Sequence, residues 1–306
     1  MNGELTVDEL RKREATVFGS ADEKIGRSKV SLSISHNLEP ELPSFNAVGE
    51  KVKVAGKSFS INILDYLAYG CHEYVKGKGT VYNRFCFQPD SSFDLLLNLR
   101  NKTAEDSILD ALCALSLFGG LGSRNRNGFG KIWVEGLSDR IPGVNKKLLE
   151  GPLASYTAGS DVTRLFRTNS SFMTWSEALN ELGLIYRSLR TSLEARHRFK
   201  KRVLISQPII ERKRDVREMF LKRHAKYIFL SVIPEKERFK GQILVMPYSF
   251  LSGIDQLGNK NKLNDILAEN YKGIDPSRLQ EDHQRSYKEV YEEVNNFFEQ
   301  RLSPVQ

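Results

Sequence analysis

The glycine-rich stretch of residues 118–132, FGGLGSRNRNGFGKI, constrains this chain more than any other feature. It holds five glycines in fifteen positions, two arginines two residues apart, and no acidic residue. Glycines permit positive φ, and successive amides can form a concave anion site. If the loop is extended, Arg124 and Arg126 lie on one side and can fork onto phosphate oxygens. The stretch therefore predicts a phosphate-binding loop or, more plainly, a turn whose arginines are solvated.

The elements on either side of this loop follow from local patterns. Thr6 and Glu9 form a capping box. Alternating apolar residues indicate half-buried strands, and apolar residues at helical spacing indicate a buried helix face. The predicted order is a helix at 7–17, a strand at 29–35, an insertion with one or two short strands at 37–64, a strand at 92–100, a helix capped by Thr103 and ended by Gly119 and Gly120, the glycine loop, and a strand at 131–137.

The position of the loop between a helix and a strand excludes the common nucleotide-binding loops. A Walker A loop joins a strand to a helix and continues Gly-Lys with Ser or Thr, whereas Ile132 follows Lys131 here. A dinucleotide fingerprint that starts at Gly120 would need glycine in place of Asn125. Residues 127–133 partly resemble the RNP1 strand of an RRM, but in that fold RNP1 is the third strand.

The predicted order is that of a ferredoxin-like βαββαβ unit without its first strand. That strand lies inside the sheet of the fold, so its absence would leave unpaired backbone groups beside the core. In the second half, we expect a helix at 174–192, a strand-like segment at 202–210, a hairpin of 226–234 with 241–251, and a helix at 276–302.

Positive charge is concentrated in one segment of the second half. Residues 193–226 hold twelve Lys or Arg against four acids, an excess of eight that equals the net charge of the whole chain. A solvated surface explains such a segment, and so does a polyanion contact that releases counterions. Phe199 could stack on a base or serve as a buried anchor. The candidate cluster consists of Arg196, Arg198, Lys200, Lys201 and Arg202.

Length and composition exclude several other classes of protein. With 306 residues and 40% hydrophobic residues, the chain can bury a core, and two domains are expected. The longest apolar run, at 108–118, is too short for a bilayer and carries Asp110. The start of the chain is polar and reads as no signal peptide. Cys71, Cys86 and Cys113 lack metal-ligand spacing, so we expect a reducing cytoplasmic setting and no metal or cofactor.

The pattern Gly-Gly-Leu-Gly-Ser-Arg-x-Arg-x-Gly-Phe-Gly resembles the hallmark of the RAMP superfamily of CRISPR proteins. Stretches at 9–20, 28–35, 92–99 and 224–251 resemble most the family of first subunits of type III-B (Cmr) effector complexes. The resemblance implies an α+β protein of tandem ferredoxin-like (RRM-like) modules with helical insertions, at 1–141 and 142–306. It implies a non-catalytic role in antiviral defence, with guide or target RNA and other Cmr-type subunits as partners.

The resemblance and the basic cluster together give the expected RNA contacts. In the loop they are Gly119, Gly120, Gly122, Ser123, Arg124, Arg126, Asn127, Gly128 and Gly130, and in the cluster Arg196, Arg198, Lys200, Lys201 and Arg202.

The chain departs from the family pattern in two places. Asn127 stands where the family often has a second basic residue, which keeps a hydrogen-bond donor and loses a charge. The family usually also carries an opening strand and an RNA-contacting segment before the first helix. We therefore expect this chain to be the larger piece of a split or truncated subunit, with another polypeptide supplying the missing strand.

The sequence leaves two other functions open, an endoribonuclease and a protein-binding scaffold. A RAMP-type, metal-independent endoribonuclease that processes CRISPR RNA would use a histidine as general acid or base. His72, near Tyr74, Lys76 and Lys78, is the best candidate, although a histidine beside a tyrosine is more often structural. A metal-dependent nuclease would need clustered carboxylates, and the acids here are scattered. The other open function is a scaffold whose basic segment binds an acidic protein.

Overall fold

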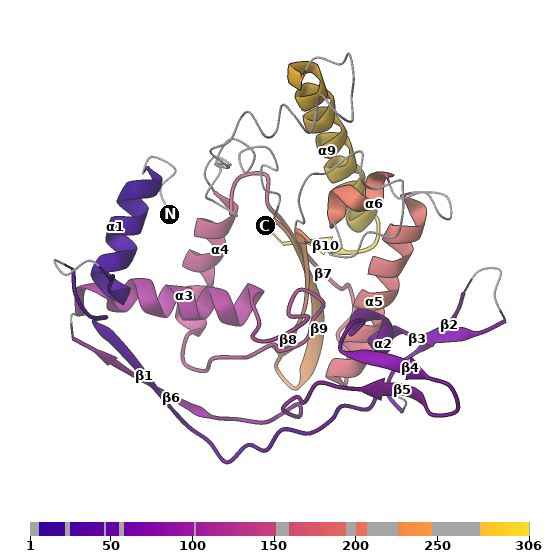
Figure 1. The fold of residues 1–306 in the computed structure, drawn as a ribbon, viewed down its shortest axis with the longest axis horizontal. Helices are drawn as coiled ribbons and strands as arrows, with labels where there is room; N and C mark the ends of the chain where they lie inside the picture. Colours follow the sequence, from indigo (N-terminus) through magenta and orange to yellow (C-terminus); the bar gives the residue numbers. More distant parts are fainter. Residues whose placement is uncertain are drawn as a thin grey trace. The chain divides into compact units, whose positions relative to one another are not determined.

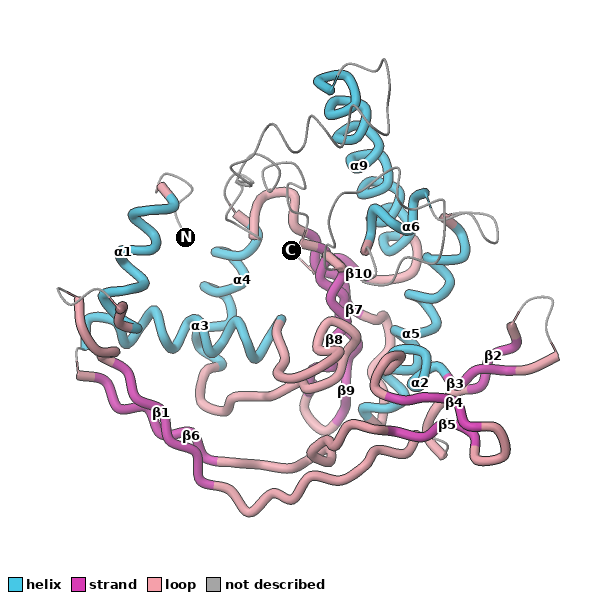
Figure 2. Tube along the Cα trace, in the orientation of Figure 1, coloured by secondary structure: helices cyan, strands magenta, loops and turns pink. Residues whose placement is uncertain are grey.

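The computed structural model describes residues 6–21, 25–45, 47–54, 58–100, 102–150, 159–193, 200–206, 226–246 and 276–305. Within these ranges, the side chains of residues 103, 200, 203, 204 and 276–287 lie outside the description. The chain forms two compact units, Met1–Asn145 and Lys146–Gln306, which we call unit 1 and unit 2 (Figures 1 and 2). Each unit is an α+β arrangement with small antiparallel sheets.

Unit 1 begins with a helix and a strand that local patterns predicted correctly. Helix α1 (Val7–Phe18) starts at the capping box, in which Glu9 N donates to Thr6 Oγ1 at 3.3 Å and Thr6 N donates to Glu9 Oε2 at 2.8 Å. Strand β1 (Val30–Ser35) pairs antiparallel with β6 (Asp94–Leu99). The predicted strands at 29–35 and 92–100 are thus confirmed, although both are slightly shorter than predicted.

The insertion between β1 and β6 contains more structure than predicted. It has two short strands, within the one or two that were expected, and these strands, β2 (Lys51–Lys53) and β3 (Ser60–Asn62), pair with each other. Helix α2 (Ile63–Leu67) follows, capped by Asn62, whose Oδ1 accepts from the backbone of the helix. The chain then forms a hairpin of β4 (His72–Val75) and β5 (Gly79–Tyr82), which no alternation in the sequence had indicated.

Helix α3 (Glu105–Phe118) confirms the predicted helix, although its start is different. The 3-10 turn Lys102–Ala104 precedes it, so Ala104 occupies the N-cap position and makes no side-chain cap hydrogen bond. The prediction that Thr103 caps this helix is therefore wrong. Gly119 occupies the C-cap, as predicted.

The strand predicted at 131–137 is absent, and this correction affects the whole unit. Residues 131–134 form no ladder, and Val134 N donates instead to Ser116 Oγ at 3.0 Å. A strand needs a neighbour to satisfy its backbone groups, and in the described part of unit 1 the β1–β6 sheet has two strands only. The 3-10 turn Ser138–Arg140 and helix α4 (Ile141–Leu149) follow.

Unit 2 is built on one four-stranded antiparallel sheet in the order β10-β7-β9-β8. Its main elements follow the chain order β-α-β-β-α-β, with α6 as an addition, and this is the order of the ferredoxin-like unit. In the described residues unit 1 lacks this order, so the tandem arrangement stays a prediction. The elements are β7 (Arg164–Arg167), α5 (Trp175–Ser192), α6 (Lys200–Ile205), β8 (Ile228–Glu235), β9 (Arg238–Val245), α9 (Pro276–Glu299) and β10 (Ser303–Pro304).

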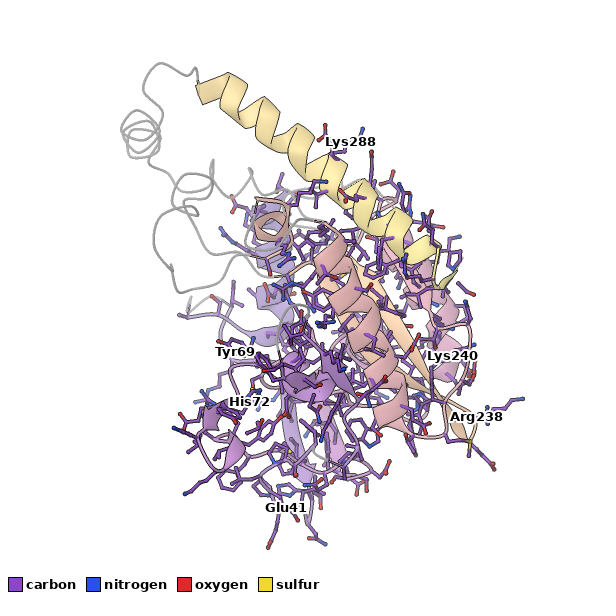
Figure 3. All side chains as sticks on the ribbon, turned by 90° about the vertical axis from the view of Figure 1, so that its right-hand side faces the viewer. Glu41, Tyr69, His72, Arg238, Lys240 and Lys288 are labelled. Atoms are coloured by element: carbon purple, nitrogen blue, oxygen red, sulfur yellow. The ribbon has the colours of Figure 1, made fainter. Side chains whose placement is uncertain are left out.

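Helices α5 and α9 cover the same face of this sheet (Figure 3). The ring of Phe166 in β7 contacts Phe298 of α9, with centroids 5.7 Å apart, and Phe166 lies opposite Ile243 of β9. Gly241, two residues before Ile243, faces Leu182 of α5 so closely that a Cβ would lie 2.8 Å from the leucine. Alternate residues of a strand share a face, so both helices pack on the face that Gly241 and Ile243 present.

Local patterns predicted most of unit 2. The helix at 174–192, the hairpin with its turn at Lys236 and Glu237, and the C-terminal helix are all present. The prediction of a strand-like segment at 202–210 is wrong for residues 202–205. These residues belong to α6, which packs on α9 and buries Ile205. Residues 207–210 lie outside the description. None of the described helices is long and apolar enough to cross a membrane.

Candidate nucleic-acid interface

The glycine loop of unit 1 is a compact turn held by its own hydrogen bonds. Leu121 N donates to Gly130 O at 2.7 Å, which ties the two ends of the loop together. Asn127 N donates to Arg124 O at 2.8 Å, and Asn125 Nδ2 donates to Gly120 O at 2.9 Å. The loop is therefore a defined structure on the surface of unit 1.

Two of its glycines are required for different reasons. Gly130 has a φ of +63°, and a Cβ there would lie 1.7 Å from the carbonyl oxygen of Leu121. Gly122 has a φ of +82° with open space around the Cβ position, so only its backbone conformation favours glycine. Arg124 also adopts a positive φ of 62°, which is uncommon for a residue with a side chain.

The loop is fastened to the turn that follows α2. Asn127 Nδ2 donates to Leu67 O at 2.7 Å, and Cys71 Sγ lies 3.5 Å from Ser123 Oγ. The guanidinium of Arg124 lies over Gly70, where a Cβ would be 2.0 Å from Nη2. Asn127, which breaks the family pattern by losing a charge, thus positions the loop. Sequence analysis missed this turn entirely.

Aromatic rings join the far end of the loop to the insertion. Phe129 stacks on Phe45 with centroids 5.5 Å apart, and Phe45 meets Tyr82 edge to face at 5.4 Å. Tyr82 donates to Asp65 Oδ1 at 2.6 Å, and burial together with this carboxylate raises the pKa of Tyr82. These contacts border a cavity of about 240 Å³, lined by residues 42–45, Asp65 and residues 80–82.

The predicted contact residues of the loop differ in exposure. Gly122, Ser123 and Arg124 are exposed, whereas Arg126 and Asn127 are half-buried. Arg126 also makes a contact within the structure. Of the two arginines, Arg124 therefore offers the more accessible cation for a phosphate.

Lys131, directly after the loop, is half-buried, with its side-chain nitrogen enclosed. Its Nζ has no hydrogen-bond partner among the described residues. Burial lowers the pKa of Lys131 to about 7, because desolvation disfavours the charged form. Lys131 therefore adds less positive charge to this surface than its sequence position suggests.

His72, the candidate for a catalytic group, lies in β4 with both ring nitrogens turned inward. Its Nε2 lies 2.8 Å from the backbone oxygen of Asp65. Its Nδ1 is buried and has no hydrogen-bond partner among the described residues. The ring packs between Tyr82, at 5.1 Å, and Tyr69, at 6.3 Å. Neither nitrogen is placed to meet a substrate from solvent.

The basic cluster belongs to unit 2 and is described only in part. Arg196 and Arg198 lie outside the described residues, as does the side chain of Lys200. Lys201 Nζ binds Glu293 Oε2 of α9 at 2.6 Å. Arg202 is half-buried and makes a contact within the structure. The described part of the cluster thus packs on α9.

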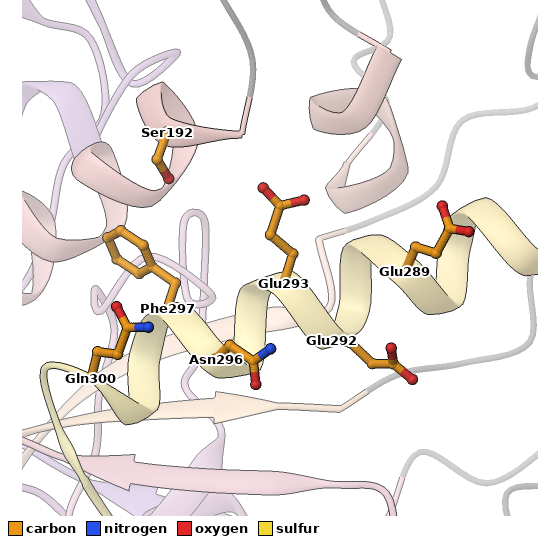
Figure 4. Close-up of a pocket in the computed structure, with 7 residues that line it drawn as sticks. All are labelled: Ser192, Glu289, Glu292, Glu293, Asn296, Phe297 and Gln300. Carbon is orange, nitrogen blue, oxygen red and sulfur yellow. The ribbon is translucent and has the colours of Figure 1, made fainter.

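A cavity of about 420 Å³ in unit 2 lies along α9 beside the end of α5. Figure 4 shows Glu289, Glu292 and Glu293 around it, with Phe297 facing Ser192. Lys201 pairs with Glu293 and Lys288 pairs with Glu292, so the charge of these carboxylates is partly neutralised. Among the described residues, no group of three or more His, Cys, Asp or Glu is arranged to hold a metal ion.

Two solved structures are similar to this chain. The crystal structure of Cmr1 from Pyrococcus furiosus (apo form) has 18% sequence identity and a TM-score of 0.45, with 79% of this chain and 73% of that chain covered. The cryo-EM structure of the type III-B Cmr-beta bound to cognate target RNA has 12% identity and a TM-score of 0.42, with 94% and 87% covered. No curated protein sequence matches the chain.

The family comparison concerns the unit that carries the glycine loop. The RAMP superfamily model matches residues 2–133. This segment contains α1, the β1–β6 sheet, the insertion, α3 and every residue of the loop. Residues 2–133 are thus similar to the RAMP superfamily.

Proposed function

We propose that this chain is a non-catalytic RNA-binding subunit of a type III-B CRISPR ribonucleoprotein effector complex that acts in antiviral defence. The glycine loop contacts the backbone of guide or target RNA, and other Cmr-type subunits complete the assembly. The observation that carries the proposal is the loop itself, a fastened turn, in a segment similar to the RAMP superfamily, that presents Ser123 and Arg124 to solvent.

The chemistry of the loop suits backbone contacts rather than reading of bases. An arginine binds two phosphate oxygens with its forked donors, and a backbone contact positions RNA without reading its sequence. The open space around Gly122 allows a phosphate to approach the main chain. Sequence specificity would then come from base pairing in the complex.

The position of His72 supports a non-catalytic role. A general acid or base must come within hydrogen-bond reach of the proton it transfers. His72 Nε2 contacts the backbone oxygen of Asp65 in α2, and Nδ1 is enclosed. His72 therefore helps to pack α2 against the β4–β5 hairpin. Metal-free cleavage of a guide precursor that is lost in His72→Ala would favour the endoribonuclease instead.

Salt-dependent binding tests the RNA contact. Each phosphate neutralised on single-stranded RNA contributes about −0.7 to the slope of log K against log salt concentration. We expect Arg124→Ala to weaken binding of a labelled single-stranded RNA to the full chain and to flatten that slope by about this amount. Fluorescence anisotropy at several salt concentrations measures both quantities.

Arg11→Ala is the matched control, because Arg11 is exposed in α1 and pairs with Asp8. It removes the same charge from unit 1. Equal effects of the two substitutions would reduce the loop to part of a general electrostatic surface. RNA binding that is independent of salt would contradict the proposal, and selective binding of an acidic protein would favour the scaffold.

The basic cluster of unit 2 is proposed as a second RNA contact. We expect joint replacement of Lys200, Lys201 and Arg202 by glutamate to weaken binding and to flatten the salt slope further. An unchanged slope would remove this cluster from the site.

A strand from another polypeptide is proposed to extend the β1–β6 sheet. The register places Val30, Leu32 and Ile34 opposite Leu99, Leu97 and Leu95, so one face of this two-stranded sheet is entirely apolar. Leu32 is 65% exposed and Ile34 is 58% exposed. Isolated two-stranded sheets are marginally stable, and a third strand would satisfy open backbone groups.

Hydrogen exchange tests this strand partner. The backbone amides of β1 and β6 should exchange more slowly in the native assembly than in the purified chain, because a new ladder would protect one edge of the pair. Identical exchange in the two samples would contradict strand addition. The amides of β9, already inside a sheet, serve as the internal reference.

A further inference from the structure

We propose that Tyr69 is a base-stacking residue, and that one nucleotide of single-stranded RNA places its phosphate at the glycine loop and its base on the tyrosine ring. This inference rests on the proposed RNA-binding function and extends it. It adds a contact to the base plane to a site that otherwise contacts the backbone.

Tyr69 lies in the turn to which the glycine loop is fastened. The three attachments of the loop reach Leu67, Gly70 and Cys71, which surround Tyr69 in the sequence. The guanidinium of Arg124 lies over Gly70, and consecutive Cα atoms are about 3.8 Å apart. The proposed phosphate contact therefore lies over the residue that directly follows the proposed stacking residue.

The tyrosine ring is exposed, and a histidine supports it from one side. Tyr69 is 72% exposed, and its ring meets that of His72 edge to face at 6.3 Å (Figure 3). His72 is itself held by its contact with the backbone oxygen of Asp65 at 2.8 Å. A platform whose support is already ordered loses little freedom when a base stacks on it. This gives His72 a positioning role.

An exposed aromatic residue on its own has no functional meaning, because single apolar side chains are common on protein surfaces. Tyr69 differs because its neighbours on the chain contact Ser123, Arg124 and Asn127 of the loop. Phe18, at the end of α1, is 57% exposed and provides a comparison within the same unit.

The test uses the full chain and a fluorescein-labelled ten-nucleotide oligoadenylate. Loss of one stacked base weakens binding by roughly 10- to 100-fold. We expect Tyr69→Ala to show such a loss with the salt slope unchanged, and Tyr69→Phe and Phe18→Ala to bind like the wild type. An oligonucleotide of abasic residues has no base to stack on Tyr69. It should therefore bind the wild type weakly, and Tyr69→Ala should bind it with the same affinity.

Three results would overturn the proposal. Wild-type affinity in Tyr69→Ala, an equal loss in Phe18→Ala, or an undiminished effect of Tyr69→Ala on the abasic oligonucleotide would each exclude stacking. If binding stays salt-dependent and sensitive to Arg124→Ala in these cases, the RNA-binding function survives and stacking alone fails. If the wild type binds no RNA, both proposals fail together.

Discussion

The two units differ in how much of their apolar surface they cover. In unit 2, residues 241–245 of the inner strand β9 are all buried, and α5 packs against Gly241. In unit 1, the β1–β6 sheet leaves Leu32 and Ile34 more than half exposed. Apart from Met173, every large hydrophobic side chain found exposed in the described residues belongs to unit 1.

This difference indicates which unit leaves apolar surface open to partners. The sheet of unit 2 has four strands and its own helical layer, so it buries an apolar face without help. Unit 1 divides its strands among three two-stranded sheets and fastens the glycine loop to one of its turns. Large exposed apolar areas mark interaction sites. We infer that the exposed apolar residues of unit 1 are left for partners, while the sheet of unit 2 needs no partner to cover its helical face.

Two leucine substitutions give the largest expected contrast. Leu182 of α5 is fully buried against Gly241, and Leu96 of β6 is 67% exposed. Leu182→Ala should lower the free energy of unfolding of unit 2 by about 2–5 kcal/mol, since it leaves a cavity. Leu96→Ala should stay within about 0.5 kcal/mol. Denaturant unfolding measures both, and similar losses would mean that Leu96 is packed in solution.

Two glycines of the loop give the next contrast. Gly122→Ala forces an L-residue into positive φ and should cost about 1–2 kcal/mol. Gly130→Ala adds a clash with Leu121 O and breaks the hydrogen bond that closes the loop, about 1–3 kcal/mol more. The free energy of unfolding and the affinity for RNA should both be lower in Gly130→Ala than in Gly122→Ala. Equal behaviour of the two variants would contradict the closed loop.

The half-buried Lys131 predicts how unit 1 responds to pH. The folded-state pKa of Lys131 is lowered to about 7, so between pH 7 and about 10 the unfolded chain binds more protons. The free energy of unfolding of unit 1 should therefore rise with pH in this window, by at most about 1.4 kcal/mol per unit. Lys131→Met should remove the slope. Urea unfolding across the window, followed by a probe in unit 1, checks this, and an unaltered slope in the variant would assign it to another group.

The ion pair between Lys201 and Glu293 should matter least. Their side chains are 45% and 40% exposed, and such pairs contribute up to about 1 kcal/mol. A double-mutant cycle with Lys201→Met and Glu293→Gln should give a coupling below this value that shrinks in high salt. A coupling well above 1 kcal/mol would make this contact a main tie between α6 and α9.

Sequence patterns predicted the elements whose causes are local. The capping box at Thr6 locates the start of α1, and the apolar spacing of Val290, Val294 and Phe298 matches the buried face of α9. The glycine loop was found because glycines and arginines are informative without partners. Its residues were therefore predictable, and their contacts were not.

The parts that sequence reasoning missed depend on distant residues. Asn127 reaches Leu67 across sixty positions, and no local pattern encodes that bond. The strand predicted at 131–137 failed because alternation indicates a capacity to pair, whereas a strand forms only beside a neighbour. Thr103 failed as a cap because a 3-10 turn precedes α3, and the motif does not exclude such a turn.

Crosslinking within the native assembly tests the central claim, that unit 1 binds RNA through the glycine loop. The assembly would be purified through this chain, irradiated at 254 nm, digested, and analysed by mass spectrometry with its RNA sequenced. We expect nucleotide adducts on peptides that contain Tyr69 or residues 119–130, and the adducts at the loop should diminish in Arg124→Ala. An assembly that contains RNA but gives adducts on its other subunits alone would contradict the account.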